Sequence, residues 1–203
     1  MPKTEFPPAI RSRPVYGELE ARPGKAHLLI ADAEGAGAIL DLAAAAPAEI
    51  WAGAHIIYVP GASGDTYTAQ LKALKPAQFY TGPSYAAASQ RINDAFSKAH
   101  MGLQVCLSGT ESLMGQAMYA ATSAGIPHSA IQTEHRGSTA RRMQCVHCKG
   151  ITENVTSDPF ECSHCGLNLF VRDHYSRRLA AFQAVCVDAE EPGNVPEKVE
   201  LFR

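Results

Sequence analysis

The sequence predicts an α/β fold: a five-stranded, doubly wound parallel sheet followed by a small zinc ribbon. Two observations predict it. Short apolar runs alternate five times with helix-forming segments between residues 27 and 134, and such alternation is typical of a parallel sheet covered by helices on both faces. Two C-x-x-C pairs then follow at 145–148 and 162–165, a spacing typical of zinc sites.

The composition limits the class of protein. The chain has 203 residues, of which 46% are hydrophobic, which is enough for one good core and a small appendage. The net charge of −2 gives no global indication of nucleic acid or of an acidic membrane surface as a partner. The first residues lack the pattern of a signal peptide, and no apolar run approaches the ~20 residues of a membrane span.

Cysteine usage indicates the compartment. Four of the six cysteines have metal-site spacing, which fits a reducing cytoplasm better than a disulfide framework. The other two, Cys106 and Cys186, are expected to be simple thiols, buried or half-buried.

We expect four parts along the chain: an extended proline-rich arm (1–25), an α/β domain (26–135), a zinc ribbon with a basic tail (136–186) and a C-terminal extension (187–203). The arm contains five prolines, and proline fixes φ and removes a backbone donor, so a helix is not expected there. Two interpretations stay open for it: a disordered leader, or an arm that lies on a partner.

The predicted strands are residues 27–31, 55–59, 77–81, 103–107 and 129–133. The first helix is rich in alanine and leucine, which favour helix, and ends before Pro47. Asp65 and Ser84 are placed to cap the next two helices, and Gly125 ends the fourth.

Ligands of doubly wound sheets usually lie beyond the carboxyl ends of the strands. Gly35 and Gly37 follow the first strand, where glycine lets the backbone approach a phosphate. Leu40 occupies the last position of the full G-x-G-x-x-G pattern, and the carboxylates of Asp32 and Glu34 would repel a pyrophosphate. The loop is therefore either a nucleotide loop or a tight turn that needs small residues.

The four thiols of Cys145, Cys148, Cys162 and Cys165 complete a tetrahedral shell for zinc. A closed shell leaves no open position for water or substrate, so these cysteines indicate a structural staple and not a catalyst. A rubredoxin-like iron site has similar spacing and is the alternative. His147 and His164 lie inside the two pairs, and we expect both to point outward.

A basic cluster follows the second pair: Arg172, His174, Tyr175, Arg177 and Arg178. Arginine and tyrosine are enriched in tight interfaces, so the cluster predicts a partner-binding surface. A solvated turn with Asp173 as the internal partner is one alternative. Phosphate contacts with nucleic acid are another, disfavoured because no aromatic platform accompanies the cluster.

Residues 27–134 resemble the nicotinamide-nucleotide half of the ferredoxin reductase family. The glycine-rich turn after the first strand and Gly109, Leu113 and Met114 after the fourth match that family. Ser108 and Thr110 replace its Cys and Pro, and the first loop also departs from it. The resemblance implies that NADPH, if bound, is lined by Gly35, Gly37, Gly109 and Thr110.

Reductases of that family carry a flavin-binding barrel before this half, whereas about 25 residues precede the first strand here, too few for a folded barrel. The sequence has neither the C-x₄-C-x₂-C run of a [2Fe–2S] cluster nor the C-x-x-C-H of attached haem. We therefore expect the chain either to work with other subunits or to serve as a scaffold.

The reductase-like domain, the four-cysteine ribbon and the run V-R-D-H-Y-S-R-R-L-A-A-F at 171–182 together resemble the small A-type subunits of bacterial dimethylamine monooxygenase. The resemblance implies an accessory subunit without catalytic residues of its own. The complex would oxidise dimethylamine to methylamine and formaldehyde with NADPH and O₂. A haem-containing oxygenase subunit and a flavin/iron–sulfur reductase subunit would carry the haem, FMN and [2Fe–2S] groups.

Two other functions stay open from the residues alone: a zinc-ribbon nucleic-acid-binding protein, and a stand-alone NADPH-dependent reductase with an external electron acceptor.

Overall fold

The computed structural model describes residues 13–61 and 64–202. The described residues form two compact units: one within residues 16–139, and one made of residues 13–15 and 140–202. The part of the predicted arm at residues 1–12 lies outside the described residues, and residues 13–25 contain no helix. In the described ranges, no helix is long and apolar enough to cross a membrane.

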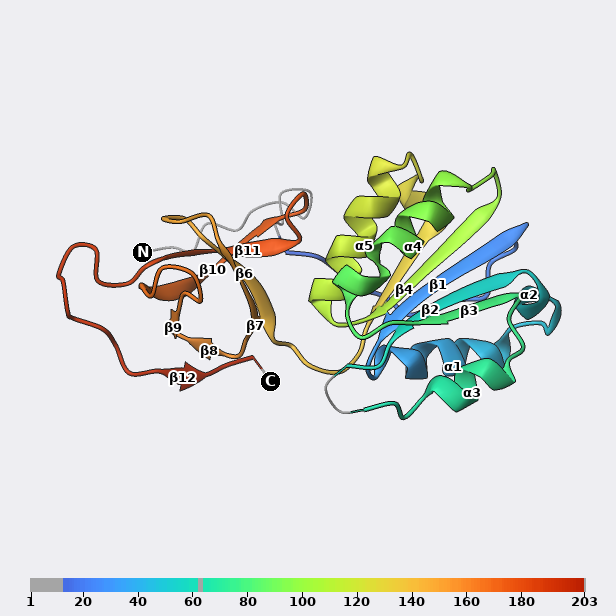
Figure 1. Ribbon diagram of the computed structural model, residues 1–203, viewed down its shortest axis with the longest axis horizontal. Coiled ribbons are helices and arrows are strands. Elements are labelled where there is room, and N and C mark those ends of the chain that lie inside the picture. The colour runs from blue at the N-terminus through green and yellow to red at the C-terminus, as the bar shows by residue number, and fades with distance from the viewer. Residues whose placement is uncertain (1–12, 62–63, 203) are drawn as a thin grey trace, which may run out of the picture. The chain divides into compact units, whose positions relative to one another are not determined.

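The first unit is built on five parallel strands, in the order β3-β2-β1-β4-β5 (Figure 1). They are β1 (Ala26–Asp32), β2 (Ala54–Val59), β3 (Gln78–Thr81), β4 (Leu103–Gly109) and β5 (Ile131–His135). The predicted five-stranded parallel sheet is confirmed. The last strand begins two residues later than predicted, because His128–Ala130 forms a 3₁₀ turn after Pro127.

Helices cover both faces of this sheet (Figure 1). One face carries α1 (Gly35–Ala45), α2 (Glu49–Ala52) and α3 (Thr68–Ala73), and the other carries α4 (Tyr85–Ser97) and α5 (Glu111–Ser123). Ser84 accepts from the Ala87 N–H (3.2 Å), and Asp65 accepts from the Thr68 N–H (3.1 Å). Ser84 is therefore the N-cap of α4, as predicted. The N-cap position of α3 is Tyr67, so Asp65 binds the first turn from two residues before the predicted place.

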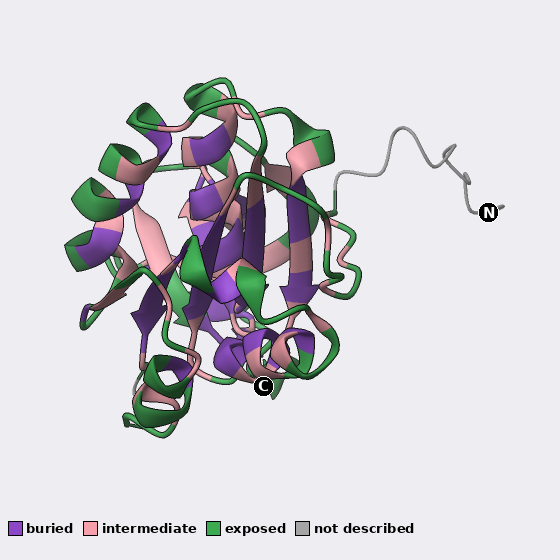
Figure 2. Ribbon diagram, turned by 90° about the vertical axis from the view of Figure 1, so that its right-hand side faces the viewer, coloured by how far each residue is buried: buried purple, intermediate pink, exposed green. Residues whose placement is uncertain are grey.

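Alternate side chains of each strand pack against opposite layers, as strand geometry requires. In β1, Leu28 and Ile30 contact the core under α4 and α5, while Leu29 and Ala31 contact the core under α1. The central strands are consequently buried on both faces, and the exposed residues lie on the outer sides of the helices (Figure 2). The first turns of α1 and α5, which follow β1 and β4, therefore lie on opposite faces of the sheet at the carboxyl ends of these two neighbouring strands.

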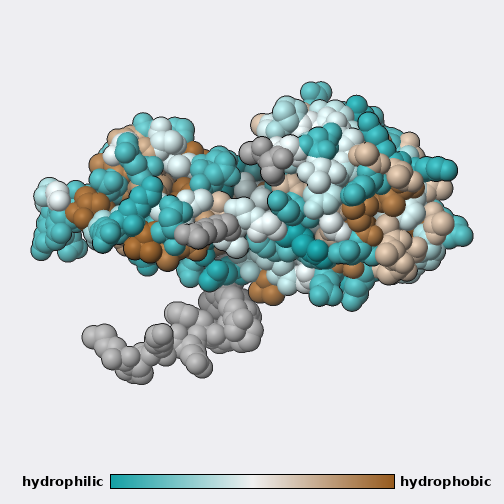
Figure 3. Space-filling model, turned by 90° about the horizontal axis from the view of Figure 1, so that it is seen from below, coloured by the Kyte–Doolittle hydropathy of each residue, from teal (hydrophilic) through white to brown (hydrophobic). Residues whose placement is uncertain are grey.

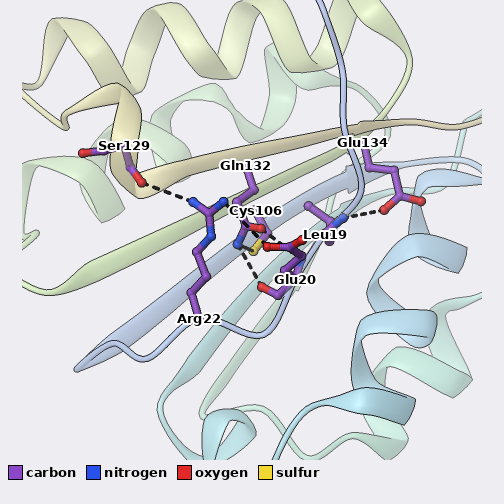
Figure 4. Close-up of polar contacts among 7 residues, drawn as sticks. All are labelled: Leu19, Glu20, Arg22, Cys106, Ser129, Gln132 and Glu134. Atoms are coloured by element: carbon purple, nitrogen blue, oxygen red, sulfur yellow. Dashed lines mark hydrogen bonds and ion pairs between the residues drawn. The ribbon is translucent and has the colours of Figure 1, made fainter.

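Residues 16–22 form an arm along β5, on the same side as α1 (Figure 4). The Gln132 amide accepts from the Glu20 N–H (2.9 Å) and donates to the Glu20 carbonyl (3.0 Å), and the Glu134 carboxylate accepts from the Leu19 N–H (2.7 Å). Leu19 packs on the core beneath. The arm therefore covers sheet surface that a further helix would cover in a longer α/β domain.

Cys106 lies under this arm, with its Sγ atom 3.9 Å from the Gln132 amide nitrogen (Figure 4). Burial raises the pKa of its thiol to about 12. A thiol with so high a pKa is inert at neutral pH, so Cys106 serves packing.

The second unit is a small β-structure with strand order β7-β6-β11-β10-β9. Its strands are β6 (Arg141–Cys145), β7 (Ile151–Val155), β8 (Ser157–Asp158), β9 (Phe160–Glu161), β10 (Asn168–Ser176), β11 (Ala181–Cys186) and β12 (Val199–Glu200). Its core joins Met143, Leu169 and Phe182 to the thiols of Cys145 and Cys162. The short strand β12 pairs with β8 and returns the C-terminal segment to the unit.

Candidate functional site

The α/β unit has one topological switch point, between β1 and β4, where the strand order reverses. Ligands of open α/β sheets bind at such a crevice, outside the carboxyl ends of the strands. Here β1 ends with Asp32 and β4 ends with Gly109, directly before Thr110. The four residues predicted to line a nucleotide, Gly35, Gly37, Gly109 and Thr110, flank this point.

Asp32 and Thr110 bind each other across the crevice. The Thr110 N–H donates to Asp32 Oδ1 (2.7 Å), and the Thr110 hydroxyl donates to Asp32 Oδ2 (2.5 Å). The same hydroxyl oxygen accepts from the Leu113 N–H (3.3 Å), so Thr110 is also the N-cap of α5. Both polar hydrogens of Thr110 are therefore used inside the protein.

Gly109 is required by this contact. Its φ of +118° is rarely adopted by residues with a side chain. A Cβ atom on Gly109 would lie 1.9 Å from Asp32 Oδ1. The carboxylate and the glycine backbone are thus packed directly on each other.

Gly35 has a similar structural role at the start of α1. A Cβ atom there would lie 2.4 Å from the Ser108 carbonyl oxygen, and the Ser108 hydroxyl donates to the Gly35 carbonyl (2.8 Å). The first turn of α1 is therefore pressed onto β4. By contrast, a Cβ on Gly37 would meet no atom closer than Arg136 Nη1 at 4.0 Å, so no close approach requires that glycine.

Burial raises the pKa of Asp32 above its ordinary value, and the charge of Glu34 acts in the same direction. The two hydrogen bonds from Thr110 lower the pKa of Asp32 but do not cancel the effect of burial. Nearby, Arg136 is paired with Glu134 (2.6 Å) and Asp41 (2.8 Å). Its positive charge is consequently balanced within the unit.

In the second unit, the structure brings together the four predicted cysteines Cys145, Cys148, Cys162 and Cys165, whose Sγ atoms all lie within 4.8 Å of one another. Cys145 and Cys165 are 3.9 Å apart, and Cys148 and Cys162 are 3.7 Å apart. A zinc ion held tetrahedrally by sulfurs at about 2.3 Å would place them about 3.8 Å apart. A disulfide needs about 2.0 Å. The spacing of the thiols therefore fits ligands of one tetrahedral metal ion and not a disulfide.

The two cysteine pairs have the same turn geometry. In the first, the Lys149 N–H donates to the Cys145 carbonyl (3.0 Å), and in the second, the Gly166 N–H donates to the Cys162 carbonyl (3.0 Å). Lys149 and Gly166 both have positive φ, at 65° and 72°. This repeated turn aims two sulfurs of each pair at one point, as a zinc ribbon requires.

Backbone donors and neighbouring thiols favour a thiolate at Cys162. Burial raises the pKa of the Cys162 thiol, but the N–H groups of His164 and Cys165 and the thiols of Cys165 and Cys148 outweigh it and bring the pKa to about 6. At Cys165 the Leu167 N–H lowers the pKa, but burial and the neighbouring thiols outweigh it and raise the pKa to about 12, so without a metal ion the thiols share their protons unequally. The Gly150 N–H also donates to Cys148 Sγ (3.4 Å). The thiolate is the form that binds metal.

The histidines inside the pairs lie outside the cluster. His147 is exposed, and the His164 Nε2 atom is 2.8 Å from the Ile151 carbonyl oxygen. Gly150 packs on the His164 ring, since a Cβ atom on Gly150 would lie 2.5 Å from it. His164 thus connects one turn to the other.

The basic cluster lies on the β10–β11 hairpin. A register shift between Val171 and Tyr175 pushes the intervening residues out of the ladder. Of the predicted partner-binding residues, Arg172, His174, Arg177 and Arg178 are exposed, and their side chains form no hydrogen bond or ion pair with the described part of the chain. Tyr175 instead packs edge-on against Phe182, with ring centroids 4.9 Å apart.

Arg141 is a buried cation that the sequence pattern did not single out. Its guanidinium carbon lies 4.3 Å from the Phe182 ring centroid and 4.2 Å from that of Phe202. It is also paired with Asp173 at 2.8 Å. Its partners are 32 to 61 residues distant in sequence, so no local spacing could have indicated them.

The exposed face seen in Figure 3 is mainly hydrophilic, with small hydrophobic patches separated by polar residues. The unpaired basic side chains of the hairpin are the more distinctive surface feature.

Comparisons with known proteins agree with this organisation. The family "Dimethylamine monooxygenase subunit DmmA-like, N-terminal domain" matches residues 8–131, and the corresponding C-terminal domain matches residues 142–185. The heme-dependent oxidative N-demethylase delta subunit of Ectopseudomonas mendocina (strain ymp) is 31% identical over 110 residues, which are 54% of this chain and 63% of that protein.

Two solved structures are similar at low identity. Phthalate dioxygenase reductase is 15% identical with a TM-score of 0.43, covering 76% of this chain and 48% of that one. Flavohemoglobin from Malassezia yamatoensis is 16% identical with a TM-score of 0.41, covering 57% and 33%. Because the two family matches together span both units, this chain belongs to the DmmA-like family of dimethylamine monooxygenase subunits.

Proposed function

We propose that the chain is an accessory subunit of a multicomponent, NADPH- and O₂-dependent monooxygenase that converts dimethylamine to methylamine and formaldehyde. The match of both units to the DmmA-like family carries this proposal. A relative of this chain is the delta subunit of a heme-dependent oxidative N-demethylase, and this supports assembly with a haem-containing oxygenase subunit. A flavin/iron–sulfur reductase subunit is the second proposed partner, as the source of electrons.

Within this assembly the metal is zinc, and its role is structural. Four thiolates close the shell and leave no position for substrate, so the ion would stabilise the fold and would not react. Cys145 and Cys162 are fully buried in the core of this unit, so metal binding and folding of the ribbon are coupled. One zinc ion per chain, measured by elemental analysis, supports this assignment, and iron would contradict it.

The ribbon in turn presents the basic hairpin to a partner. We assign Arg172, His174, Arg177 and Arg178 to contacts with an acidic patch on a partner subunit, because they are exposed cationic or titratable groups without internal partners. Electrostatic complementarity of this kind directs the encounter and fixes orientation. Tyr175 supports the hairpin through its contact with Phe182.

Reconstitution tests the proposed function. Haem and flavin proteins that co-purify with the chain would be separated and assayed for NADPH-dependent formaldehyde release from dimethylamine, with and without this chain. We expect activity or complex stability to fall when it is omitted, and the isolated chain to show no haem or flavin absorption. Full activity and an intact complex without the chain would contradict an accessory role.

A further inference from the structure

We infer that the α/β unit binds no dinucleotide at its switch point, because the carboxylate of Asp32 occupies the position where an anion would bind. A nucleotide is what the switch point of a doubly wound sheet implies, and what the resemblance to the reductases implies for Gly35, Gly37, Gly109 and Thr110. The contacts of these residues do not fit it.

The first misfit concerns donors. Backbone N–H groups at a helix start, helped by a hydroxyl, are what hold phosphate oxygens in this class of site. At α5, the Thr110 N–H and hydroxyl bind the two oxygens of Asp32 (2.7 and 2.5 Å), and the Leu113 N–H binds Thr110 (3.3 Å). An internal carboxylate thus takes these donors.

The second misfit concerns space. Glycines in a nucleotide loop leave room for the backbone to approach the pyrophosphate. Here the room beside Gly109 is filled by Asp32, and the room beside Gly35 is filled by the Ser108 backbone, since Cβ atoms built there would lie 1.9 and 2.4 Å from those groups. The glycines accommodate protein atoms instead of a ligand.

The third misfit concerns charge. Glu34 lies close enough to Asp32 to repel its charge. Glu111, in the first turn of α5, is held by a hydrogen bond from the Tyr16 hydroxyl (2.9 Å). Three carboxylates therefore surround the crevice, while Arg136 is already paired with Glu134 and Asp41. Among the described residues that surround the crevice, a pyrophosphate would meet repulsion from these carboxylates, and the charge of Arg136 is already balanced.

The arrangement assigns NADPH binding to another chain of the complex. This consequence rests on the proposed function, but the inference itself concerns the isolated chain. If the chain fails to join a complex yet also fails to bind NADPH, only the proposed function is overturned.

Calorimetric titration with NADPH and with inorganic pyrophosphate tests the inference. The wild type should show no saturable binding at about 1 mM ligand, where a site with a Kd of 1 mM would be half filled. Asp32→Ala frees the Thr110 donors and removes one of the three carboxylates, so it should bind pyrophosphate weakly, but more tightly than the wild type does. Asp94→Ala is the matched control, because it removes an exposed carboxylate of α4 and should behave as the wild type.

Two results would overturn the inference: saturable NADPH binding by the wild type, or an Asp32→Ala protein that is folded by circular dichroism and binds pyrophosphate no more tightly than Asp94→Ala. If Asp32→Ala does not fold, NMR titration of the wild-type protein with NADPH tests the inference instead. Addition of NADPH should leave the amide signals of Gly35, Gly109 and Thr110 in place, and a saturable shift of these signals would contradict the account.

Discussion

Lys149 and Gly166 have the same left-handed backbone conformation at equivalent places, each directly after the second cysteine of its pair. Both donate their N–H to the carbonyl of the first cysteine, at 3.0 Å. Glycine adopts this conformation without strain, whereas a residue with a side chain loses about 1–2 kcal/mol. The two turns of the ribbon therefore have one geometry but unequal backbone strain.

Exchanging these residue types should shift stability in opposite directions. Gly166→Ala should lower the free energy of unfolding by about 1 kcal/mol through strain alone, since the new Cβ would meet no atom closer than 3.8 Å. Lys149→Gly should raise it by a similar amount. Urea unfolding of the metal-loaded proteins measures both, and destabilisation by Lys149→Gly would contradict the shared turn.

Loss of one sulfur should release the metal. Cys162→Ser replaces a buried ligand in the core of the ribbon, and we expect the metal content to fall from one ion per chain to near zero, with loss of the ribbon's thermal transition. Cys186→Ser is the control, because Cys186 donates to Asp188 (3.1 Å) and lies outside the cluster. Metal loss in the control, or unchanged metal in Cys162→Ser, would contradict the assignment.

The raised pKa of Asp32 predicts a pH dependence. A carboxyl with a higher pKa in the folded state stabilises the fold below its unfolded pKa of about 3.9, and this contribution is lost as pH rises through the folded pKa. Burial is the main cause of the shift. Asp32→Asn stays neutral, so its stability relative to the wild type should increase as the pH rises above about 4. Urea unfolding at a series of increasing pH values measures the difference, and a decrease would contradict the shift.

Arg141 should tolerate lysine poorly. Its planar guanidinium lies over the rings of Phe182 and Phe202 and pairs with Asp173, and lysine cannot reproduce these contacts. We expect Arg141→Lys to lower the free energy of unfolding by about 1–2 kcal/mol. Arg142→Lys, at a residue paired with Glu153, should cost less. Equal losses in chemical denaturation would show that stacking contributes nothing.

The basic hairpin should govern partner affinity. Arg177→Glu with Arg178→Glu reverses two exposed charges, and we expect at least about tenfold weaker binding to the partner subunits, or roughly 1.4 kcal/mol, with a loss of salt dependence. Lys198→Glu reverses an exposed charge elsewhere in the same unit and should bind normally. Surface plasmon resonance at two salt concentrations separates these outcomes.

Local signals in the sequence were sufficient for the sheet and the cysteine cluster. Strand runs, the caps at Asp65 and Ser84 and the two C-x-x-C pairs all depend on residues a few positions apart, where spacing determines geometry. Asp32 was recognisable as an unfavourable neighbour of a pyrophosphate, because charge is visible in the sequence.

Long-range packing was not predictable in the same way. The pairing of Asp32 with Thr110 joins residues 78 positions apart, and it depends on which strands become neighbours at the switch point. The same holds for the arm, where Leu19 and Glu20 bind side chains of β5. Proline content indicated an extended segment, but the surface that the segment covers is a property of the folded sheet.

Co-purification tests the central claim most directly. The chain would carry an affinity tag and be isolated from its native cells during growth on dimethylamine, and the eluate would be examined by size-exclusion chromatography with absorption spectra. We predict one complex that contains this chain, haem and flavin, with about one zinc ion per chain in the isolated subunit. Elution of the chain as a monomer, with neither haem nor flavin protein attached, would contradict the account.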